Sequence, residues 1–204
     1  MVEHASSSHT NAPRNLARIS VTAYGNSKNF IIRSYAMYKY LNQFMDSPRN
    51  LTKPSNSFYR IDDIEIKKAE KELGITFPSE LRQFYREIGY GFLTHPIKFD
   101  KDYIFYSVNR INPPSMIVDM VKNGHDSGLI SQDTYEMLQP GDLPFFEIHD
   151  SSNFLIMKPE SLHPNAVYTV YTNIKIEDSF EQFIWRLYHE DPAYYSENWA
   201  KDYL

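Results

Sequence analysis

Apolar residues recur at helical spacing in two adjacent segments between residues 62 and 89. The first segment would place three of them on one helix face: Ile66, Ala69 and Leu73. Asp62 precedes this segment and Glu65 follows it three residues later, which is the pattern of a capping box. Gly74 stands where a left-handed residue ends many helices. The pattern therefore predicts a helix that begins after Asp62 and ends at Gly74.

A second helix is predicted directly after the first. Thr76 is its expected N-cap, Pro78 suits its first turn, and Glu80 lies near the positive end of the helix dipole. Its apolar face consists of Leu81, Phe84, Tyr85 and Ile88. Gly89 ends this helix, so residues 62–89 predict two short helices joined by a tight turn.

The N-terminal part of the chain has a weaker pattern. Residues 1–14 are polar and are expected to be disordered, and residues 16–24 alternate loosely, which predicts a short strand. A helix over residues 28–45, packed on the main body, is predicted from apolar residues at helical spacing: Ile31, Tyr35, Tyr38, Leu41 and Met45. Residues 48–56 have the composition of a linker.

Downstream of residue 100 the pattern changes. Strands are predicted at residues 103–108, 143–148, 153–157 and 166–171, and helices at residues 115–122 and 131–138. Short polar turns join the last three strands, which favours antiparallel pairing. Ser179 caps a last helix with the apolar face Phe180, Phe183, Ile184 and Leu187. The predicted fold class is α+β: a mainly antiparallel sheet with an N-terminal helix pair and a closing C-terminal helix packed on it.

Charge divides the chain into a basic start and an acidic body. Residues 1–60 hold eight Lys and Arg against two Asp and Glu. Residues 61–204 hold 13 basic and 24 acidic residues, a formal charge of −11. An acidic body repels phosphate backbones, so direct binding of nucleic acid is disfavoured. It would attract a basic partner, although acidity that serves only solubility is at least as common.

The composition excludes several kinds of chemistry. The 204 residues include no Cys, which excludes disulfides, thiolate nucleophiles and cysteine-ligated metals. No apolar run approaches the roughly 18–20 residues that a membrane-spanning helix needs. A cytoplasmic protein without membrane association is therefore expected. The 16 Tyr and 13 Phe suit both a core and a binding surface.

We predict no catalytic, cofactor-binding or metal-ligating residues. Residues 189–191, His-Glu-Asp, come nearest to a metal cluster, but zinc needs three or four converging ligands, so a solvated helix end is favoured. Residues 149–152, His-Asp-Ser-Ser, indicate a turn, because no nucleophile elbow precedes the serines. Residues 89–91, Gly-Tyr-Gly, lie at a helix C-terminus, the wrong end of the dipole for phosphate.

The helix pair carries residues in a recognisable order. The order is Ile66-x-x-Ala69-Glu70-x-x-Leu73-Gly74-x-x-Phe77-Pro78-x-x-Leu81-x-x-Phe84, closing with Gly89-Tyr90-Gly91. It resembles the signature of the SUKH superfamily (Smi/Knr-type domain), which joins fungal cell-wall regulators to bacterial immunity proteins. Residues 109–114, 143–146, 153–156 and 167–184 resemble the later strands and the closing helix of that family. Residues 84–92 are most similar to immunity proteins (antitoxins) of the YxxD type.

The resemblance implies a division of the chain. A SUKH-like domain would occupy residues 61–190, after a disordered start (1–14) and an extension with one helix and a linker (15–60), and before a tail (191–204). Gly74 and Pro78 would shape the turn between the two helices, and Glu70 would support it by hydrogen bonding. Residues 149–153 replace the Gly-rich hairpin turn that the family usually has, and residues 1–60 have no counterpart in it.

The resemblance also implies a function. The chain would be a non-catalytic immunity protein that binds a cognate bacterial toxin and occludes its active site. A basic, nuclease-type toxin is expected, because an acidic surface suits a basic substrate groove. Candidate toxin-binding residues, chosen by residue type and position, are Tyr90 and Phe92 at the helix exit, Asp100 and Asp102 in a loop, and Asp150 in the hairpin turn.

Two other functions stay open. A regulatory scaffold that binds several protein partners, like the fungal members, would use the basic extension as a docking arm. An enzyme with an unrecognised site would show a deep pocket with clustered, perturbed titratable groups. A toxin gene beside the gene for this chain would favour the immunity protein over the scaffold.

Overall fold

The computed structural model describes residues 36–47, 55–100, 103–148, 153–191 and 194–196, and gives the backbone alone for residues 95–100 and 103–107. The strand predicted at residues 16–24 lies outside this part of the chain, as does the polar start. The sheet consists of β1 (Ser57–Tyr59), β2 (Tyr90–Asp100), β3 (Tyr103–Ile111), β4 (Leu143–Glu147), β5 (Phe154–Met157), β6 (Val167–Thr169) and β7 (Lys175–Glu177). The α-helices are α1 (Asp63–Leu73), α2 (Ser79–Glu87), α3 (Pro114–Asn123), α4 (Gln132–Met137) and α5 (Phe180–His189). Short 3₁₀ helices are η1 (Lys39–Phe44), η2 (Gly124–Ser127) and η3 (Tyr194–Ser196).

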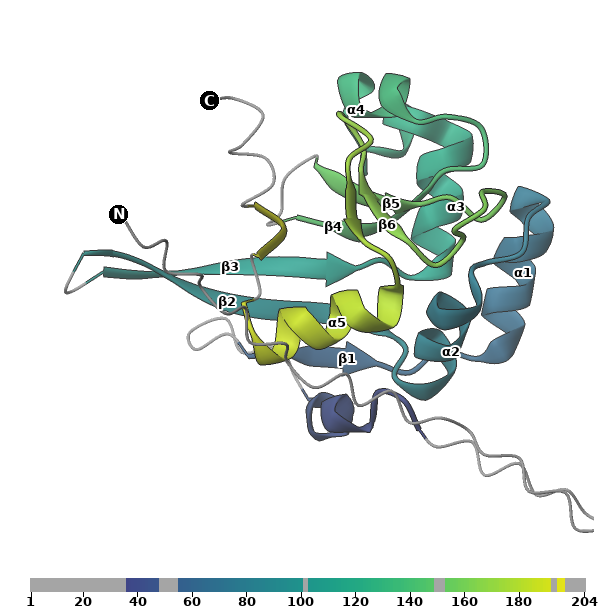
Figure 1. Ribbon diagram of the computed structural model, residues 1–204. Coiled ribbons are helices and arrows are strands. Elements are labelled where there is room, and N and C mark those ends of the chain that lie inside the picture. The colour runs from purple at the N-terminus through teal and green to yellow at the C-terminus, as the bar shows by residue number, and fades with distance from the viewer. Residues whose placement is uncertain (1–35, 48–54, 101–102, 149–152, 192–193, 197–204) are drawn as a thin grey trace, which may run out of the picture. The chain divides into compact units, whose positions relative to one another are not determined.

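Each strand pairs with the next strand along the chain, so the sheet is an antiparallel meander in the order β1 to β7. The helix α1 packs along α3, and α3 lies against β4. The helix α5 crosses the sheet on its other side (Figure 1). The predicted α+β class, with an antiparallel sheet, a helix pair and a closing helix, is confirmed.

The strand prediction was incomplete. The four strands predicted between residues 103 and 171 are present, but β1, β2 and β7 were missed. Two of the missed strands, β1 and β7, are three residues long, which is too short for an alternating pattern to show. The strand β2 contains Gly91 and Pro96, residue types that strands usually lack.

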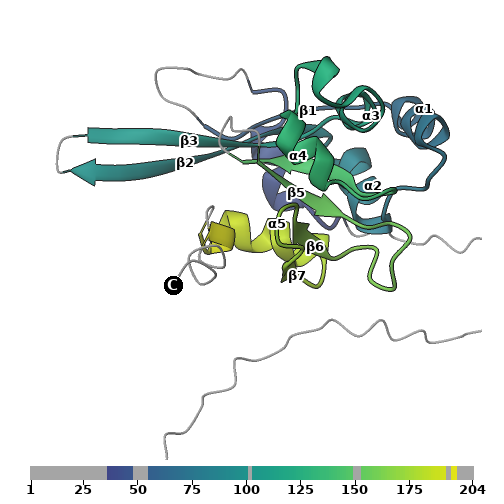
Figure 2. The same cartoon turned by 90° about the horizontal axis from the view of Figure 1, so that it is seen from above.

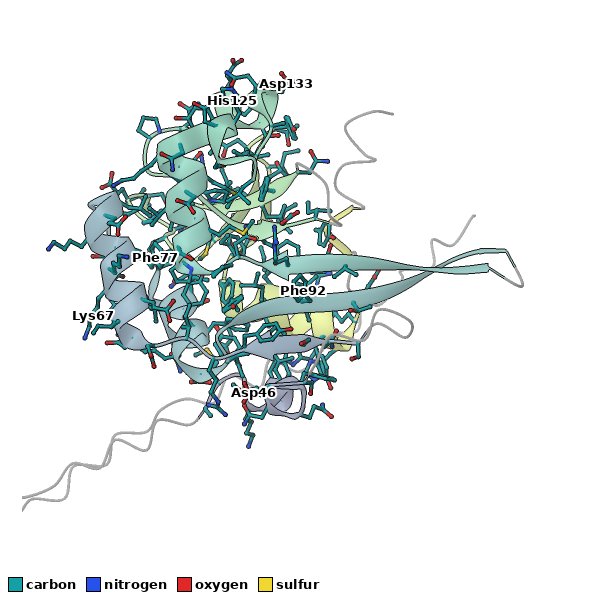
Figure 3. The ribbon with its side chains drawn as sticks, turned by 180° about the vertical axis from the view of Figure 1, so that it is seen from behind. Asp46, Lys67, Phe77, Phe92, His125 and Asp133 are labelled. Carbon is teal, nitrogen blue, oxygen red and sulfur yellow. The ribbon has the colours of Figure 1, made fainter. Side chains whose placement is uncertain are left out.

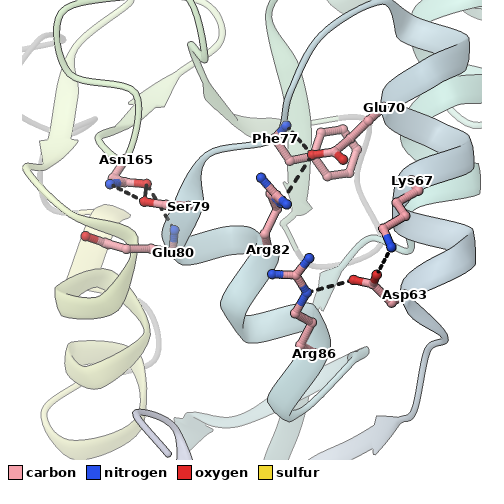
Figure 4. A network of polar contacts seen from close by, with 9 residues as sticks. All are labelled: Asp63, Lys67, Glu70, Phe77, Ser79, Glu80, Arg82, Arg86 and Asn165. Atoms are coloured by element: carbon pink, nitrogen blue, oxygen red, sulfur yellow. Dashed lines mark hydrogen bonds and ion pairs between the residues drawn. The ribbon is translucent and has the colours of Figure 1, made fainter. Parts of the chain in front are cut away.

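The turn between α1 and α2 is built around one carboxylate (Figure 4). Gly74 ends α1 in the left-handed conformation, with φ of 72°. An oxygen of Glu70 accepts a hydrogen bond from the backbone N–H of Phe77 at 2.8 Å, and Arg82 forms an ion pair with the same oxygen at 3.4 Å. The predicted roles of Gly74 and Glu70 are therefore confirmed.

The predicted N-cap position of α1 is confirmed, but its capping box and the predicted N-cap of α2 were wrong. Asp62 occupies the N-cap of α1, but its side chain makes no capping hydrogen bond. Instead the backbone carbonyl of Asp62 accepts from the N–H of Glu65 at 2.9 Å, so the capping box does not form. Thr76 does not cap α2, because the chain stays extended through Pro78, whose ψ is 141°. The helix α2 starts at Ser79 instead.

The closing helix α5 seals the core. The hydroxyl of Ser179 accepts the N–H of Gln182 at 3.0 Å, which confirms the predicted cap. The four predicted apolar residues of α5, Phe180, Phe183, Ile184 and Leu187, are all buried. The ring of Phe183 meets the rings of Phe145 and Phe146 edge-on, at 5.9 and 5.1 Å. This packing fixes α5 on the sheet.

A segment that precedes β1 completes the core. Residues 36–45 were predicted as the end of a helix over residues 28–45, but the described part contains only the 3₁₀ helix η1. Tyr38 and Leu41 are fully buried. The ring of Tyr38 lies edge-on to Phe84 of α2 at 5.0 Å and to Phe180 of α5 at 6.2 Å. The segment therefore packs on α2 and α5, as expected.

Candidate interaction surface

The strand β2 positions Tyr90 and Phe92, two of the candidate toxin-binding residues. They are two residues apart, so both lie on the same side of the sheet. The intervening Gly91 and the following Leu93 belong to the opposite side, where Leu93 is 2% exposed and part of the core. Tyr90 and Phe92 are each half-buried. Their rings line a surface rather than fill the interior.

Strand register adds neighbours to this surface. Tyr59 of β1 is paired with Tyr90, and their ring centroids lie 5.6 Å apart. Phe92 is paired with Arg110 of β3. We call Tyr59, Tyr90, Phe92 and Arg110 the aromatic face. In Figure 3, α5 lies behind the sheet and the strands around Phe92 are turned toward the viewer.

Arg110 is neutralised within the protein. Its guanidinium forms an ion pair with Glu147 of β4, and its Nε donates to Asn112 at 3.2 Å. Asn112 is fully buried and donates from its own side chain to the carbonyl of Pro144 at 3.0 Å. Because each group in this chain of contacts is held by the next, Arg110 is fixed in place. Arg110 therefore forms a fixed polar edge of the aromatic face.

Two glycines allow β1 to approach this strand. A Cβ at Gly89 would lie 1.9 Å from the carbonyl oxygen of Tyr59, and one at Gly91 would lie 2.1 Å from that of Ser57. Gly89 also has a positive φ of 104° and follows Ile88, the C-cap of α2. The predicted role of residues 89–91 as a helix stop is confirmed. Their second role, close contact with β1, was not predicted because β1 itself was missed.

The structure does not bring all five candidates together. Asp100 was expected in a loop but is the last residue of β2, paired with Tyr103. It lies eight residues beyond Phe92, roughly 27 Å along an extended strand. Asp102 and Asp150 lie outside the described residues. Of the three described candidates, Tyr90 and Phe92 therefore lie close together, whereas Asp100 lies at the distant end of the same strand.

Asp100 ends a two-stranded ribbon. The strand β1 pairs with β2 only up to Phe92, and β4 pairs with β3 only from Arg110 onward. Within the described part of the chain, β2 and β3 therefore have no other strand partner between these positions and the hairpin tip, although the N–H of Thr94 donates to the side chain of Asn56 at 2.9 Å. Figure 2 shows β2 and β3 running together away from the helices. The ribbon therefore continues β2 and β3 beyond the aromatic face.

Sequence reasoning missed Tyr59, Arg110 and Glu147 as neighbours of the candidates. Their proximity depends on the pairing of β1 with β2 and of β3 with β4. Strand register between segments distant in sequence is not encoded in a local pattern. The three-residue length of β1 removed the one signal that would have placed Tyr59 there.

Perturbed carboxyl groups in the described part of the chain lie apart from this surface. Burial raises the pKa of Asp142, which accepts the N–H of Gln139 at 3.0 Å and lies 3.8 Å from Lys158. Burial, together with Glu80 and Glu87, raises the pKa of Glu181 on α5. Among the described residues, no group of three or more His, Cys, Asp or Glu is arranged to hold a metal ion. No helix in that part of the chain is long and apolar enough to cross a membrane.

The arrangement defines an α+β protein with a meander sheet, an α1–α2 pair joined at Gly74, and an aromatic sheet face. A family model described as SMI1 / KNR4 family (SUKH-1) matches residues 60–186. The chain belongs to this family. It is also 31% identical over 140 residues to Immunity protein YxxD of Bacillus subtilis (strain 168), a match that covers 68% of this chain and 88% of the relative. No solved structure matches the chain.

Proposed function

We propose that this chain is an immunity protein that binds a cognate bacterial toxin and neutralises it. The observation that carries the proposal is the similarity to Immunity protein YxxD, which extends over most of both chains. The family match over residues 60–186 includes the helix pair and the strands β2 to β7. A binding function depends on an ordered surface rather than on a catalytic cluster, and the ion pair and hydrogen bond of Arg110 hold one edge of the aromatic face in place.

The toxin is proposed to be basic and of the nuclease type. Residues 61–204 carry a formal charge of −11, which would draw a basic protein toward this domain and speed their association. Nuclease active sites present basic grooves to the phosphate backbone of their substrates. An acidic protein that occupies such a groove blocks the substrate. We therefore propose neutralisation by occlusion of the active site, without catalysis by the immunity protein.

The toxin-binding surface is proposed to be the aromatic face and the ribbon beyond it. Tyr90 and Phe92 combine apolar area with partial exposure, as anchor residues at interfaces do. Asp100 continues the same strand toward the hairpin tip, and Asp102 follows it in sequence. Asp150 remains a proposed contact from the segment between β4 and β5.

Affinity capture from the native organism, followed by mass spectrometry and a salt series, tests this function. We expect one basic toxin domain to be recovered, with binding that weakens steeply as the salt concentration rises. Recovery of several unrelated proteins would favour the regulatory scaffold instead. Turnover of a small molecule by the purified chain, with no captured partner, would contradict the proposal.

A further inference from the structure

The solvent-facing side of α5 carries a stripe of large side chains. Glu181, Trp185 and His189 are spaced four residues apart, so they lie one above the other on the helix, and all three are exposed. Trp185 is 45% exposed, although the opposite side of α5 fills the core. The rings of Trp185 and His189 are stacked at 4.6 Å with an angle of 23° between their planes. A Trp held rigid at the surface is a frequent anchor of protein–protein interfaces.

The segment before β1 extends this stripe. The ring of Tyr40 lies 5.0 Å from His189 and 5.2 Å from Tyr188. The side chain of Gln43 donates to the hydroxyl of Tyr188 at 2.9 Å. These contacts join η1 to the end of α5. Residues 40–43 and 188–189 lie outside the matched family span of residues 60–186, whereas Glu181 and Trp185 lie within it.

Two further carboxylates, Glu80 and Glu87, border the stripe beside Glu181, which is part of it. Glu80 accepts the backbone N–H of Glu181 at 2.8 Å, and Glu87 accepts the backbone N–H of Tyr38 at 2.9 Å. Burial and the negative charges of Glu80 and Glu87 raise the pKa of Glu181. Within the described residues, none of these three carboxylates forms an ion pair. The carboxylates of this group are therefore not paired with a cation of the described chain and are available to pair with one from a partner.

A cation that binds here would interact with both the exposed ring of Trp185 and the neighbouring carboxylates. A planar guanidinium stacks on the face of an aromatic ring and can pair with a carboxylate at the same time. An ammonium is a compact, strongly hydrated charge and stacks less well. Trp185 supplies the ring, and Glu181 supplies a carboxylate one helical turn away. The chemistry of the stripe is therefore selective for arginine over lysine.

We propose that Trp185 and Glu181, with Tyr40 and His189 beside them, form a docking surface for an arginine side chain of a protein partner. The guanidinium stacks on Trp185 and pairs with Glu181, while Glu80 and Glu87 add to the attraction. The proposal rests on the proposed function only for the identity of the partner, since a basic toxin would supply the arginine. The surface itself is distinct from the aromatic face.

Isothermal titration of the full chain with a nona-arginine peptide at fixed ionic strength tests the proposal. We expect Trp185→Ala and Glu181→Gln each to weaken binding about two- to fivefold. Glu65→Gln is the matched control, because it removes the same charge from an exposed position on α1 and should leave the affinity unchanged. A nona-lysine peptide should bind more weakly than nona-arginine.

Equal losses in Glu181→Gln and Glu65→Gln, or no loss in Trp185→Ala, would overturn the proposal, since binding would then be unspecific charge attraction. Trp185→Phe keeps a ring and should bind more tightly than Trp185→Ala, which provides a second test if the alanine variant folds poorly. If sedimentation showed a dimer that the Trp185→Ala variant does not form, a second copy of the chain would occupy this surface. That result would overturn the proposal of an arginine from a partner. If the affinity capture recovered no toxin but the peptide still bound as predicted, the proposed function would be contradicted and the proposed arginine-binding surface would not.

Discussion

The carboxylate of Glu70 accepts the backbone N–H of Phe77 at 2.8 Å, across the turn that joins α1 to α2. Phe77 lies beyond the end of α1, and its own ring is buried in the core. The hydrogen bond therefore ties the first helix to the start of the second. Because Arg82 pairs with the same oxygen, the carboxylate links three parts of the helix pair.

Removal of this carboxylate should destabilise the fold. We expect Glu70→Ala to lower the free energy of unfolding by about 1–3 kcal/mol, since a backbone N–H loses its acceptor. Glu70→Gln keeps an acceptor and should cost less. The control is Glu72→Ala, whose exposed pair with Lys68 spans 3.8 Å and should contribute within about 0.5 kcal/mol. Urea denaturation measures all three, and an equal effect of Glu70→Ala and Glu72→Ala would refute the role of Glu70.

Gly89 should not tolerate a side chain. Gly89→Ala would place a Cβ 1.9 Å from the carbonyl of Tyr59, so β1 must separate from β2. We expect a loss of about 3 kcal/mol or more, or failure to fold. Gly128→Ala is the matched control, because Gly128 also has positive φ, 70°, but nothing lies within 4 Å of the added Cβ. It should cost only about 1 kcal/mol. Thermal unfolding of both variants distinguishes a close approach from a backbone preference.

The segment before β1 should be needed for stability. Tyr38→Ala empties a buried site between Phe84 and Phe180 and should cost about 3–5 kcal/mol. Tyr38→Phe keeps the ring and loses only a 3.3 Å hydrogen bond to the carbonyl of Glu80, so it should cost less than about 1.5 kcal/mol. Residues 55–204 keep β1 but lack this segment, so unfolding at the same urea concentration as the full chain would contradict the prediction.

Two aspartates should show opposite dependence on pH. Burial raises the pKa of Asp142, so the folded chain holds this proton more tightly than the unfolded chain. The stability of the wild type relative to Asp142→Asn should therefore fall as pH rises from about 4 through the raised pKa. Hydrogen bonds from Lys67 and Arg86 lower the pKa of Asp63. The stability of the wild type relative to Asp63→Asn should instead be lost as pH falls from about 4 through the lowered pKa.

Urea midpoints between pH 3 and pH 7 measure both differences. The two variants serve as controls for one another, because each removes one carboxylate. Slopes of the same sign for Asp142→Asn and Asp63→Asn would contradict the assigned environments.

The aromatic face should carry binding energy for the toxin. We expect Tyr90→Ala and Phe92→Ala each to weaken toxin binding about tenfold or more, as anchor residues do. Leu162→Ala is the control, because Leu162 is 95% exposed and lies between β5 and β6, away from this face. Titration calorimetry with the captured toxin measures the three affinities. Unchanged affinity in both aromatic variants would place the toxin on another surface.

Local patterns predicted the local structures well. The caps at Gly74 and Ser179 depend on residues less than ten positions apart, and both are present. The Glu70 contact, which the family resemblance implied, is equally local and is also present. The strands β4 and β5 have continuous apolar runs and were also predicted. The capping box at Asp62 failed because a backbone hydrogen bond took the place of the side-chain bond.

Contacts between distant segments could not be predicted in the same way. The pairing of Tyr59 with Tyr90 joins residues more than 30 positions apart, through a strand of three residues. The packing of Tyr40 against His189 joins the two ends of the described chain. Residue type and position selected Tyr90 and Phe92 as candidate binding residues, and the structure places both on one side of β2, a strand that was not predicted. The position of Asp100 relative to them could not be predicted, and the role of all three in binding stays a prediction. The predicted domain limits at residues 61 and 190 stay predictions.

Co-expression with a toxin encoded beside this gene tests whether the chain neutralises a toxin in the cell. The measurement is the number of colonies that a bacterial host forms when the toxin is induced. We predict that the wild-type chain and Leu162→Ala restore growth, and that the double variant Tyr90→Ala/Phe92→Ala does not, although it accumulates as a folded protein. Death of the host despite equal amounts of folded wild-type chain would contradict the account.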